Sequence, residues 1–178
     1  MAGMIEVAID EPMRAAASAK LERCKNLKRE KLNRFGSEPE RTYYGYLGEQ
    51  LVMKYLDVTE DSDDYEYDVL YRGYRLDIKS ISCKFKPPVT FLCTVNSCYD
   101  EGEHRQEADF YVFARVKYDC TIGWILGFMH CGDFFKRSTY IPKGSTFQGM
   151  EFFKANANVI PISKLEPMHY LKEIHEFV

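Results

Sequence analysis

The chain has 178 residues and a mass of 20.8 kDa, a size typical of one domain with a sizeable core. Hydrophobic residues make up 46% of the chain and aromatic residues 15%, which excludes an intrinsically disordered protein. No apolar run approaches the roughly 18 residues that a membrane helix needs, and Asp10 and Glu11 interrupt the first segment before a signal-like run develops. We therefore expect a single globular domain in the cytoplasm.

Charge is distributed unevenly along the chain. Lys and Arg number 24 and Asp and Glu number 27, and the resulting net charge of −3 argues against a protein that is basic over its whole surface. Residues 14–34 nevertheless contain eight bases and two acids, a net charge of +6 against −9 for the remainder. This segment fits either a solvated helix surface or an arm that contacts phosphate groups.

The six cysteines predict reduced thiols, because the chain has no secretory signal and no dense, regular cysteine spacing. The alternative is a zinc site, whose candidate ligands are Cys93, Cys98, His130 and Cys131. These positions lack the paired short spacing of a structural zinc motif.

Two helices are predicted in the first third of the chain. Residues 13–35 are rich in good helix formers, and their apolar stripe consists of Leu21, Cys24, Leu27, Leu32 and Phe35. Gly36 is a suitable end for this basic helix. Ser37 with Glu40 forms a capping box, with a proline in the first turn, and predicts a second helix that runs to about Leu56.

An acidic segment separates these helices from a region of strands. Residues 57–68 contain seven acids and no base, which is typical of a solvated loop. The alternating pattern that follows predicts five strands, at residues 67–71, 74–80, 89–97, 109–116 and 121–129. Beyond them we expect a loop at residues 144–149, a short apolar segment at 159–162 and a last helix after Pro167.

A tight turn at Arg72 and Gly73 brings two carboxylates together in this arrangement. A two-residue hairpin loop, which Gly73 favours, places Asp68 directly opposite Asp77 on one face of the sheet. Directly opposed residues have Cβ atoms about 4.5–5.5 Å apart, and like charges placed so repel each other. Mg²⁺ would offset this repulsion, because it binds through one or two carboxylates and keeps waters that a phosphate can replace.

Two further residues extend this acidic pair. Lys79 points to the same face as Asp77, about 6.6 Å further along the strand, where an ammonium can orient or help deprotonate an attacking water, or neutralise charge on phosphorus. Glu49 shares a helix face with Gly45, and a glycine costs about 1 kcal/mol inside a helix. We therefore expect Gly45 and Gly48 to permit close approach to the sheet, so that Glu49 reaches the acids. The alternatives are a surface Lys–Asp pair and an exposed glutamate.

Three short segments carry these residues: Gly45-Tyr46-Leu47-Gly48-Glu49, Tyr67-Asp68-Val69-Leu70 and Leu76-Asp77-Ile78-Lys79-Ser80. Together they resemble the motifs of the PD-(D/E)XK nuclease superfamily, whose fold is that of restriction endonucleases. The strands at 109–113 and 123–127 are similar to those of uncharacterised phage and bacterial members. Tyr67 stands in place of the proline in the family name, and the helix that the fold has between its third and fourth strands is hard to see at 96–108.

The resemblance implies an α/β fold with an αβββαβ core and a central mixed five-stranded sheet flanked by helices. It implies that Asp68 and Asp77 bind Mg²⁺, with Mn²⁺ as an alternative cation. Glu49 would assist this metal site, and Lys79 would act on the water. The expected function is a Mg²⁺-dependent deoxyribonuclease in the cytoplasm, which for a phage protein is that of the host.

The expected DNA contacts are Lys25, Lys28 and Arg29, from the charge of the basic helix, and Asn96, which sits after the strand that carries Lys79, where some members of the family have a polar Gln or Asn. DNA is the expected partner rather than a membrane, and both a monomer and a homodimer fit the sequence. One alternative is a catalytically silent nucleic-acid-binding or assembly protein on the same fold. A third interpretation, an acidic mimic of DNA, depends only on residues 57–68.

Overall fold

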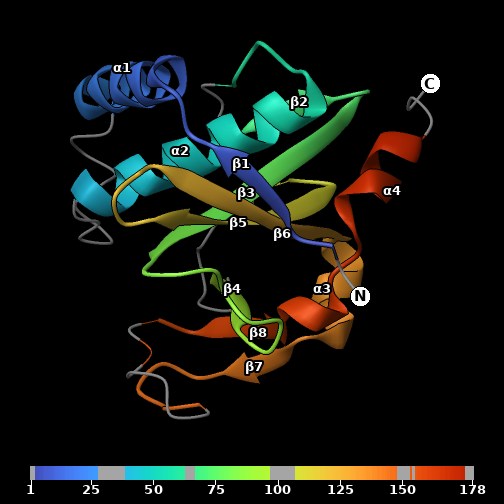
Figure 1. Cartoon of the computed structure of the whole chain (residues 1–178). Coiled ribbons are helices and arrows are strands. Elements are labelled where there is room, and N and C mark those ends of the chain that lie inside the picture. The colour runs from blue at the N-terminus through green and yellow to red at the C-terminus, as the bar shows by residue number, and fades with distance from the viewer. Residues whose placement is uncertain are drawn as a thin grey trace.

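The computed structural model describes residues 3–27, 39–62, 67–96, 107–147, 153 and 155–174, which form two sheets and the helices packed on them (Figure 1). The larger sheet has five strands: β1 (Ile5–Ala8), β6 (Ile122–His130), β5 (Phe110–Lys117), β3 (Tyr74–Cys83) and β2 (Val69–Tyr71), in that spatial order. Strands β3 and β5 are parallel, and the other neighbours are antiparallel. The predicted mixed α/β class is confirmed.

Two long helices cover one face of this sheet. Helix α1 (Glu11–Leu27) begins two residues before the predicted Met13, because the Asp10 carboxylate caps it by accepting the Met13 N–H at 3.1 Å. Helix α2 (Pro39–Leu56) ends where the sequence predicts. The predicted continuation of the first helix to Phe35 and the capping residue Ser37 lie outside the described residues.

The second sheet has three antiparallel strands in the order β4 (Leu92–Asn96), β8 (Ala157–Pro161) and β7 (Thr139–Ile141). The prediction that residues 89–97 join the central sheet is therefore wrong, because β4 pairs with β8 and buries Cys93 and Val95 in the core between the second sheet and the central sheet. The fifth strand of the central sheet is β1, which we did not predict. It has only four residues and half-buried apolar positions, a weak strand signal.

Apolar side chains fill the space on both faces of the central sheet. Leu47 and Leu51 of α2 pack with Leu76 and Val112 on the helical side. The opposite face packs on the second sheet and on α3 (Cys131–Arg137) through Phe113, Trp124, Leu126, Phe134 and Ile160. Helix α4 (Met168–Glu173) follows the predicted Pro167.

Edge strand β2 is where the main sheet meets the acidic segment. It follows residues 57–62 of that segment, which come directly after α2. In the part of the chain that is described, no helix combines the length and the apolar character that a bilayer crossing requires.

Candidate active site

The β2–β3 hairpin has the predicted register and brings the motif acids to the edge of the main sheet. Its pairs are Val69 with Leu76, Leu70 with Arg75 and Tyr71 with Tyr74. Arg72 and Gly73 both have positive φ angles, 51° and 82°, as a type I′ turn requires. Because this conformation is unfavourable for an arginine, two hydrogen bonds of 2.9 Å from Arg72 Nη1 to the carbonyls of Lys172 and Ile174 help to hold it.

Asp68 does not pair directly opposite Asp77, although the register of the hairpin predicts that position. The regular pairing ends at Val69, and the Asp68 N–H donates to the Leu76 carbonyl at 2.9 Å. The Asp68 carboxylate in turn accepts the N–H of Ile78, with a distance of 2.6 Å between Oδ2 and N. This hydrogen bond fixes the Asp68 carboxylate to the backbone of β3, next to Asp77. The pairing of the hairpin predicts that the two residues are neighbours, but it does not predict this hydrogen bond.

Asp77 lies at the centre of the site and is only 2% exposed. Its Oδ2 lies 2.7 Å from Lys79 Nζ, which makes an ion pair, but no described group meets this buried oxygen with the angles of a hydrogen bond. A buried carboxylate oxygen without a hydrogen bond is costly, and such exceptions often mark a site for an ion or water. Asp77 and Asp68 together therefore fit a hard divalent cation.

The carboxylates of Asp68 and Asp77 carry like charges, which repel each other. Burial and the neighbouring charge of Asp77 raise the pKa of Asp68 to about 6, although the Ile78 N–H and Lys79 act in the opposite direction. Burial lowers the pKa of Lys79, but the charges of Asp77 and Asp68 outweigh it and raise that pKa above the usual range. Lys79 is therefore a cation at neutral pH, which suits it to orient a water or neutralise a phosphate rather than remove a proton.

Glu49 comes from α2 and lies close enough to Asp68 for the two charges to interact, and it has a buried partner that the sequence did not reveal. The Glu49 carboxylate is 5% exposed, and its Oε2 lies 2.7 Å from Nζ of Lys20, which is 4% exposed. Burial and the charge of Asp68 raise the pKa of Glu49 to about 8, against the opposing effect of Lys20. Lys20 follows Met13 and Ala17 on the buried stripe of α1, and this helical spacing was the available signal.

Lys20 also contacts the acidic segment. Its Nζ lies 3.2 Å from Asp61 Oδ2 and donates to the Ser62 carbonyl at 3.0 Å. Asp61 and Ser62 are half-buried, so this described part of residues 57–68 is packed against the helices rather than fully solvated. The segment is predicted to be solvated over most of its length; Asp57, Thr59 and Glu60 are exposed, whereas a buried ammonium holds Asp61 and Ser62.

Close contact between α2 and β3 positions Glu49. A Cβ atom on Gly48 would overlap Ser80 of β3, so the helix backbone touches the strand that carries Asp77 and Lys79. The predicted close approach at Gly48 is therefore confirmed. The same prediction for Gly45 is wrong, because the space around its missing side chain is open.

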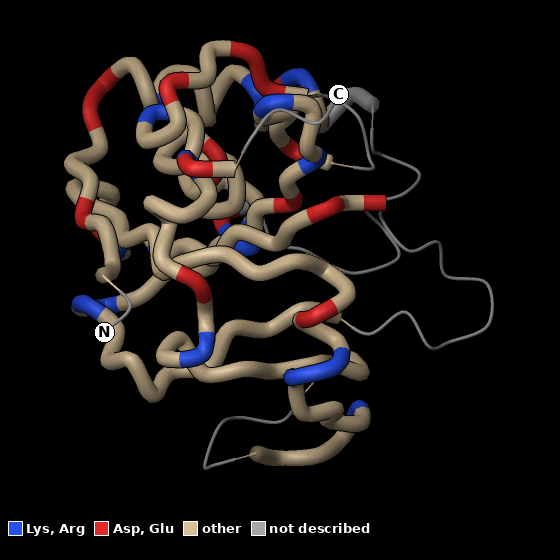
Figure 2. The backbone as a smooth tube through the Cα atoms, turned by 90° about the vertical axis from the view of Figure 1, so that its right-hand side faces the viewer, with Lys and Arg blue, Asp and Glu red and all other residues tan. Residues whose placement is uncertain are grey.

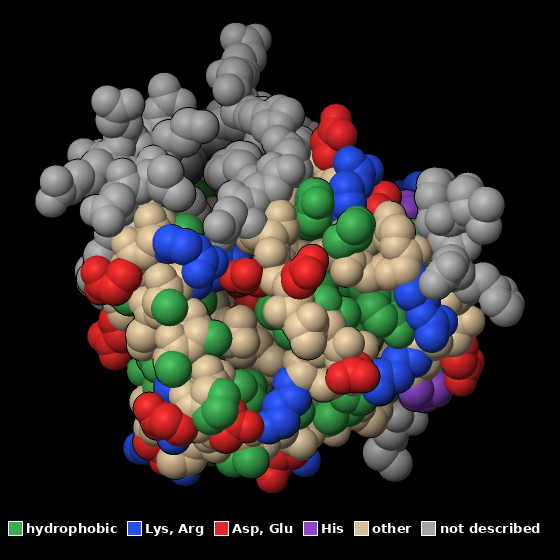
Figure 3. Space-filling model, turned by 90° about the horizontal axis from the view of Figure 1, so that it is seen from above, with side chains coloured by type: hydrophobic (Ala, Val, Ile, Leu, Met, Phe, Trp, Pro, Cys, Tyr) green, Lys and Arg blue, Asp and Glu red, His purple; other side chains and the backbone are tan. Residues whose placement is uncertain are grey.

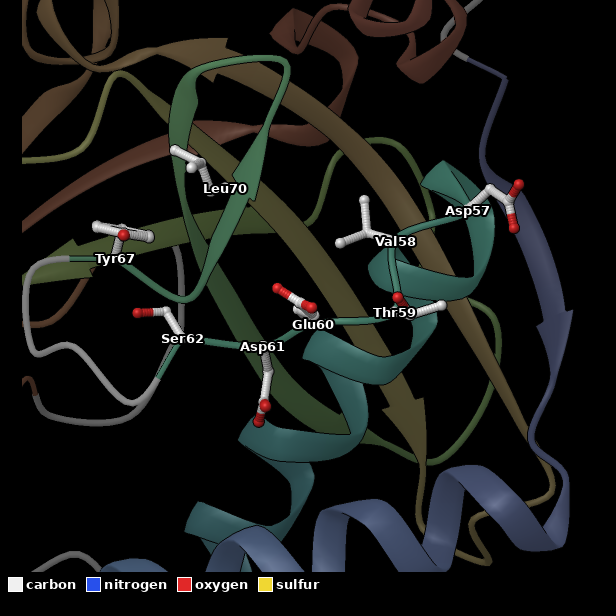
Figure 4. Close-up of a pocket in the computed structure, with 8 residues that line it drawn as sticks. All are labelled: Asp57, Val58, Thr59, Glu60, Asp61, Ser62, Tyr67 and Leu70. Carbon is white, nitrogen blue, oxygen red and sulfur yellow. The ribbon is translucent and has the colours of Figure 1, made fainter.

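A shallow groove of about 460 Å³ lies beside the site, lined by residues 57–62 with Tyr67 and Leu70 (Figure 4). Tyr67 and the hairpin residue Leu70 form one wall, and Asp61 points from the other wall toward the helices. Three acidic residues line this groove, namely Asp57, Glu60 and Asp61. Its charge disfavours contact with a phosphate backbone.

The predicted DNA contacts are not brought to the acids by the described residues. Lys25 belongs to α1, but its side chain and all of Lys28 and Arg29 lie outside the described part of the chain. Asn96 is exposed at the end of β4 and pairs with Ala157 in the second sheet, away from the β2–β3 hairpin in the fold. Seen from above, basic and acidic side chains alternate over the described surface (Figure 3).

Three ligands for one metal ion do not converge anywhere among the described His, Cys, Asp and Glu residues. Asp68 and Asp77 thus remain a pair, which is sufficient for Mg²⁺ or Mn²⁺ because these cations retain water ligands. For the weaker zinc alternative, Cys98 lies outside the described residues, and His130 Nδ1 accepts the N–H of Gly132 at 3.2 Å. The cysteines described are free thiols.

Comparison with known proteins assigns no family to this chain. Neither a family model nor a curated protein sequence matches it.

Proposed function

We propose that the chain is a Mg²⁺-dependent deoxyribonuclease with a restriction-endonuclease-like α/β fold. The observation that carries this proposal is the buried Asp77 carboxylate, whose Oδ2 has an ion pair with Lys79 but no partner at hydrogen-bond angles among the described residues, next to a second carboxylate, that of Asp68. The order of the motifs along the chain, with Glu49 on a helix and Asp77 and Lys79 on one strand, supports the same assignment.

Asp68 and Asp77 are the residues that would hold the cation. When bound, Mg²⁺ polarises a phosphodiester oxygen and lowers the pKa of a bound water. The hydrogen bond from Ile78 fixes the direction of Asp68, and burial limits the rotation of Asp77. These two restraints keep the carboxylates oriented before a substrate arrives.

Lys79 acts on the reacting phosphate and water. Its ammonium is held 2.7 Å from Asp77 Oδ2 and 5.9 Å from the centre of the Tyr111 ring, while about a third of its side chain remains exposed. From this position it can orient a water and offset charge that develops on the phosphate. Glu49 borders the same group of charges and adds negative potential that favours a cation.

The proposal is tested with the purified full chain on linear, circular, single-stranded and branched DNA. We expect cleavage with Mg²⁺, none with EDTA, and a loss of about a hundredfold or more on Asp77→Asn, which removes a charge that meets the cation. Asp133→Asn is the matched control, because Asp133 is an exposed carboxylate of α3 whose Oδ1 lies 3.5 Å from Nζ of the exposed Lys136. Equal results for wild type and Asp77→Asn on all four substrates would contradict the proposal.

A further inference from the structure

We propose that Lys20 is a positioning residue of the active site, which holds Glu49 together with Asp61 and Ser62 of the acidic segment in place beside Asp68. The inference rests on the proposed nuclease function. It concerns a residue of the basic helix α1 that lies outside the three motifs of the resemblance.

The Lys20 ammonium lies close to three oxygen atoms from two segments of the chain and donates hydrogen bonds to two of them, those of Glu49 and Ser62. Nζ lies 2.7 Å from Glu49 Oε2 of α2. It lies 3.2 Å from Asp61 Oδ2 and 3.0 Å from the carbonyl oxygen of Ser62. Because α1 brings this one group to both α2 and the acidic segment, the docking of α1 determines where Glu49 points.

Lys20 is enclosed as well as paired. Its side chain is 5% exposed, and Nζ lies 5.3 Å from the centre of the Tyr46 ring. Without the ammonium, the buried Glu49 carboxylate would face the charge of Asp68 with no compensating cation. A carboxylate in that situation turns away or takes up a proton, and either change alters the site.

These contacts argue against a role for Lys20 in binding phosphate. A buried ammonium that already faces two carboxylates and a carbonyl oxygen of the protein is poorly placed to meet a phosphate of DNA. Its described neighbours in the basic helix also have protein partners: Arg14 Nε lies 3.0 Å from Glu11 Oε2, and Arg23 Nη2 lies 3.4 Å from Asp61 Oδ2. The basic side chains of this part of α1 therefore pair with acids of the protein itself, Lys20 in the interior and Arg14 and Arg23 at the surface.

The test compares Lys20→Met, Lys20→Arg, Glu49→Gln and the double variant Lys20→Met/Glu49→Gln. Lys54→Met is the matched control, because Lys54 Nζ lies 2.7 Å from Asp10 Oδ2 and also joins α2 to the start of α1, with both side chains 46% exposed. For each variant, kcat and KM for DNA cleavage are measured with Mg²⁺. The affinity for uncleaved DNA is measured by fluorescence anisotropy in EDTA.

We expect Lys20→Met to lower kcat by about tenfold or more, with KM and the affinity in EDTA changed by less than about twofold. Lys20→Arg should recover part of kcat, because it retains the charge. The double variant should match Glu49→Gln, since the effect of Lys20 passes through Glu49. Lys54→Met should match wild type.

The inference is overturned if Lys20→Met retains wild-type kcat, if its affinity for DNA in EDTA falls about tenfold, or if the two losses multiply in the double variant. Should Lys20→Met not fold, the double variant removes the unpaired charge, and a further tenfold loss relative to Glu49→Gln overturns the inference. A wild type that cleaves no DNA would overturn the proposed function itself. That result is distinct from an active wild type without a Lys20 effect.

Discussion

The ionised form of Asp68 is subject to opposing electrostatic effects. Burial and Asp77 disfavour its ionised form, whereas one backbone N–H and two lysines favour it. Burial and the charge of Asp68 likewise disfavour the ionised form of Glu49 and raise its pKa. The protein without a cation therefore retains repulsion that a divalent ion would relieve, and this repulsion has a measurable dependence on pH.

The free energy of unfolding in EDTA should fall as the pH rises from about 5 to about 8. Asp68 has a pKa of about 6 in the folded chain against 3.8 as its ordinary value, so the folded state binds more protons between these values. Stability then decreases with rising pH across that window, and Glu49, with a pKa raised to about 8, adds to the decrease.

Asp68→Asn should remove part of this decrease and stabilise the protein by about 1–2 kcal/mol near pH 8, because the amide carries no charge. Urea unfolding at the two pH values measures the effect, and Asp133→Asn is the control. A variant whose stability changes with pH as steeply as that of wild type would show that Asp68 is not strained by its neighbours.

Local spacing explains which site residues could be predicted. Asp77 and Lys79 share a face because side chains alternate along a strand, and this depends on one segment alone. The position of Lys20 depends on how α1 packs against α2, which no local pattern specifies. Its place on the apolar stripe with Met13 and Ala17 indicates burial but does not identify the partner.

At the scale of elements, the contact between α2 and β3 controls the distance from Glu49 to the acids. Gly48→Ala should destabilise the protein by about 1–3 kcal/mol, because the added Cβ would overlap Ser80. Gly45→Ala is the control on the same helix, and it should stabilise by about 0.5–1 kcal/mol, because the space is open and alanine favours a helix.

Urea unfolding of both variants measures these opposite effects. Equal changes for the two variants would mean that α2 does not rest on β3 through Gly48. If the contact is as described, Gly48→Ala should also lower the cleavage rate, since it moves the helix that carries Glu49.

Turn chemistry explains why the hairpin was predicted more accurately than the sheets. Arg72 and Gly73 specify a two-residue turn, and that turn sets the register of three pairs. The pairing rule fails at Asp68, where the carboxylate bonds to the Ile78 N–H. The exchange of β4 for β1 in the central sheet was not predictable from local alternation, because sheet membership depends on contacts between distant segments.

At the scale of the whole molecule, Asp77 and Lys79 lie on the face of the central sheet that packs on the second sheet and α3, whereas Glu49 lies on the face that the helices cover. Basic and acidic positions lie next to each other over the upper half of the described chain (Figure 2). This mixture agrees with a net charge of −3. A local cation at the acids, rather than a broad basic surface, is therefore the main electrostatic requirement of the proposed function.

Calorimetric titration of the full chain with Mg²⁺ tests most directly whether Asp68 and Asp77 share an ion. We predict that wild type and Asp133→Asn bind one Mg²⁺ per chain and gain thermal stability on binding, and that Asp77→Asn loses both effects. Mn²⁺ should give the same pattern. Equal binding by wild type and Asp77→Asn, or no binding by wild type, would contradict the account.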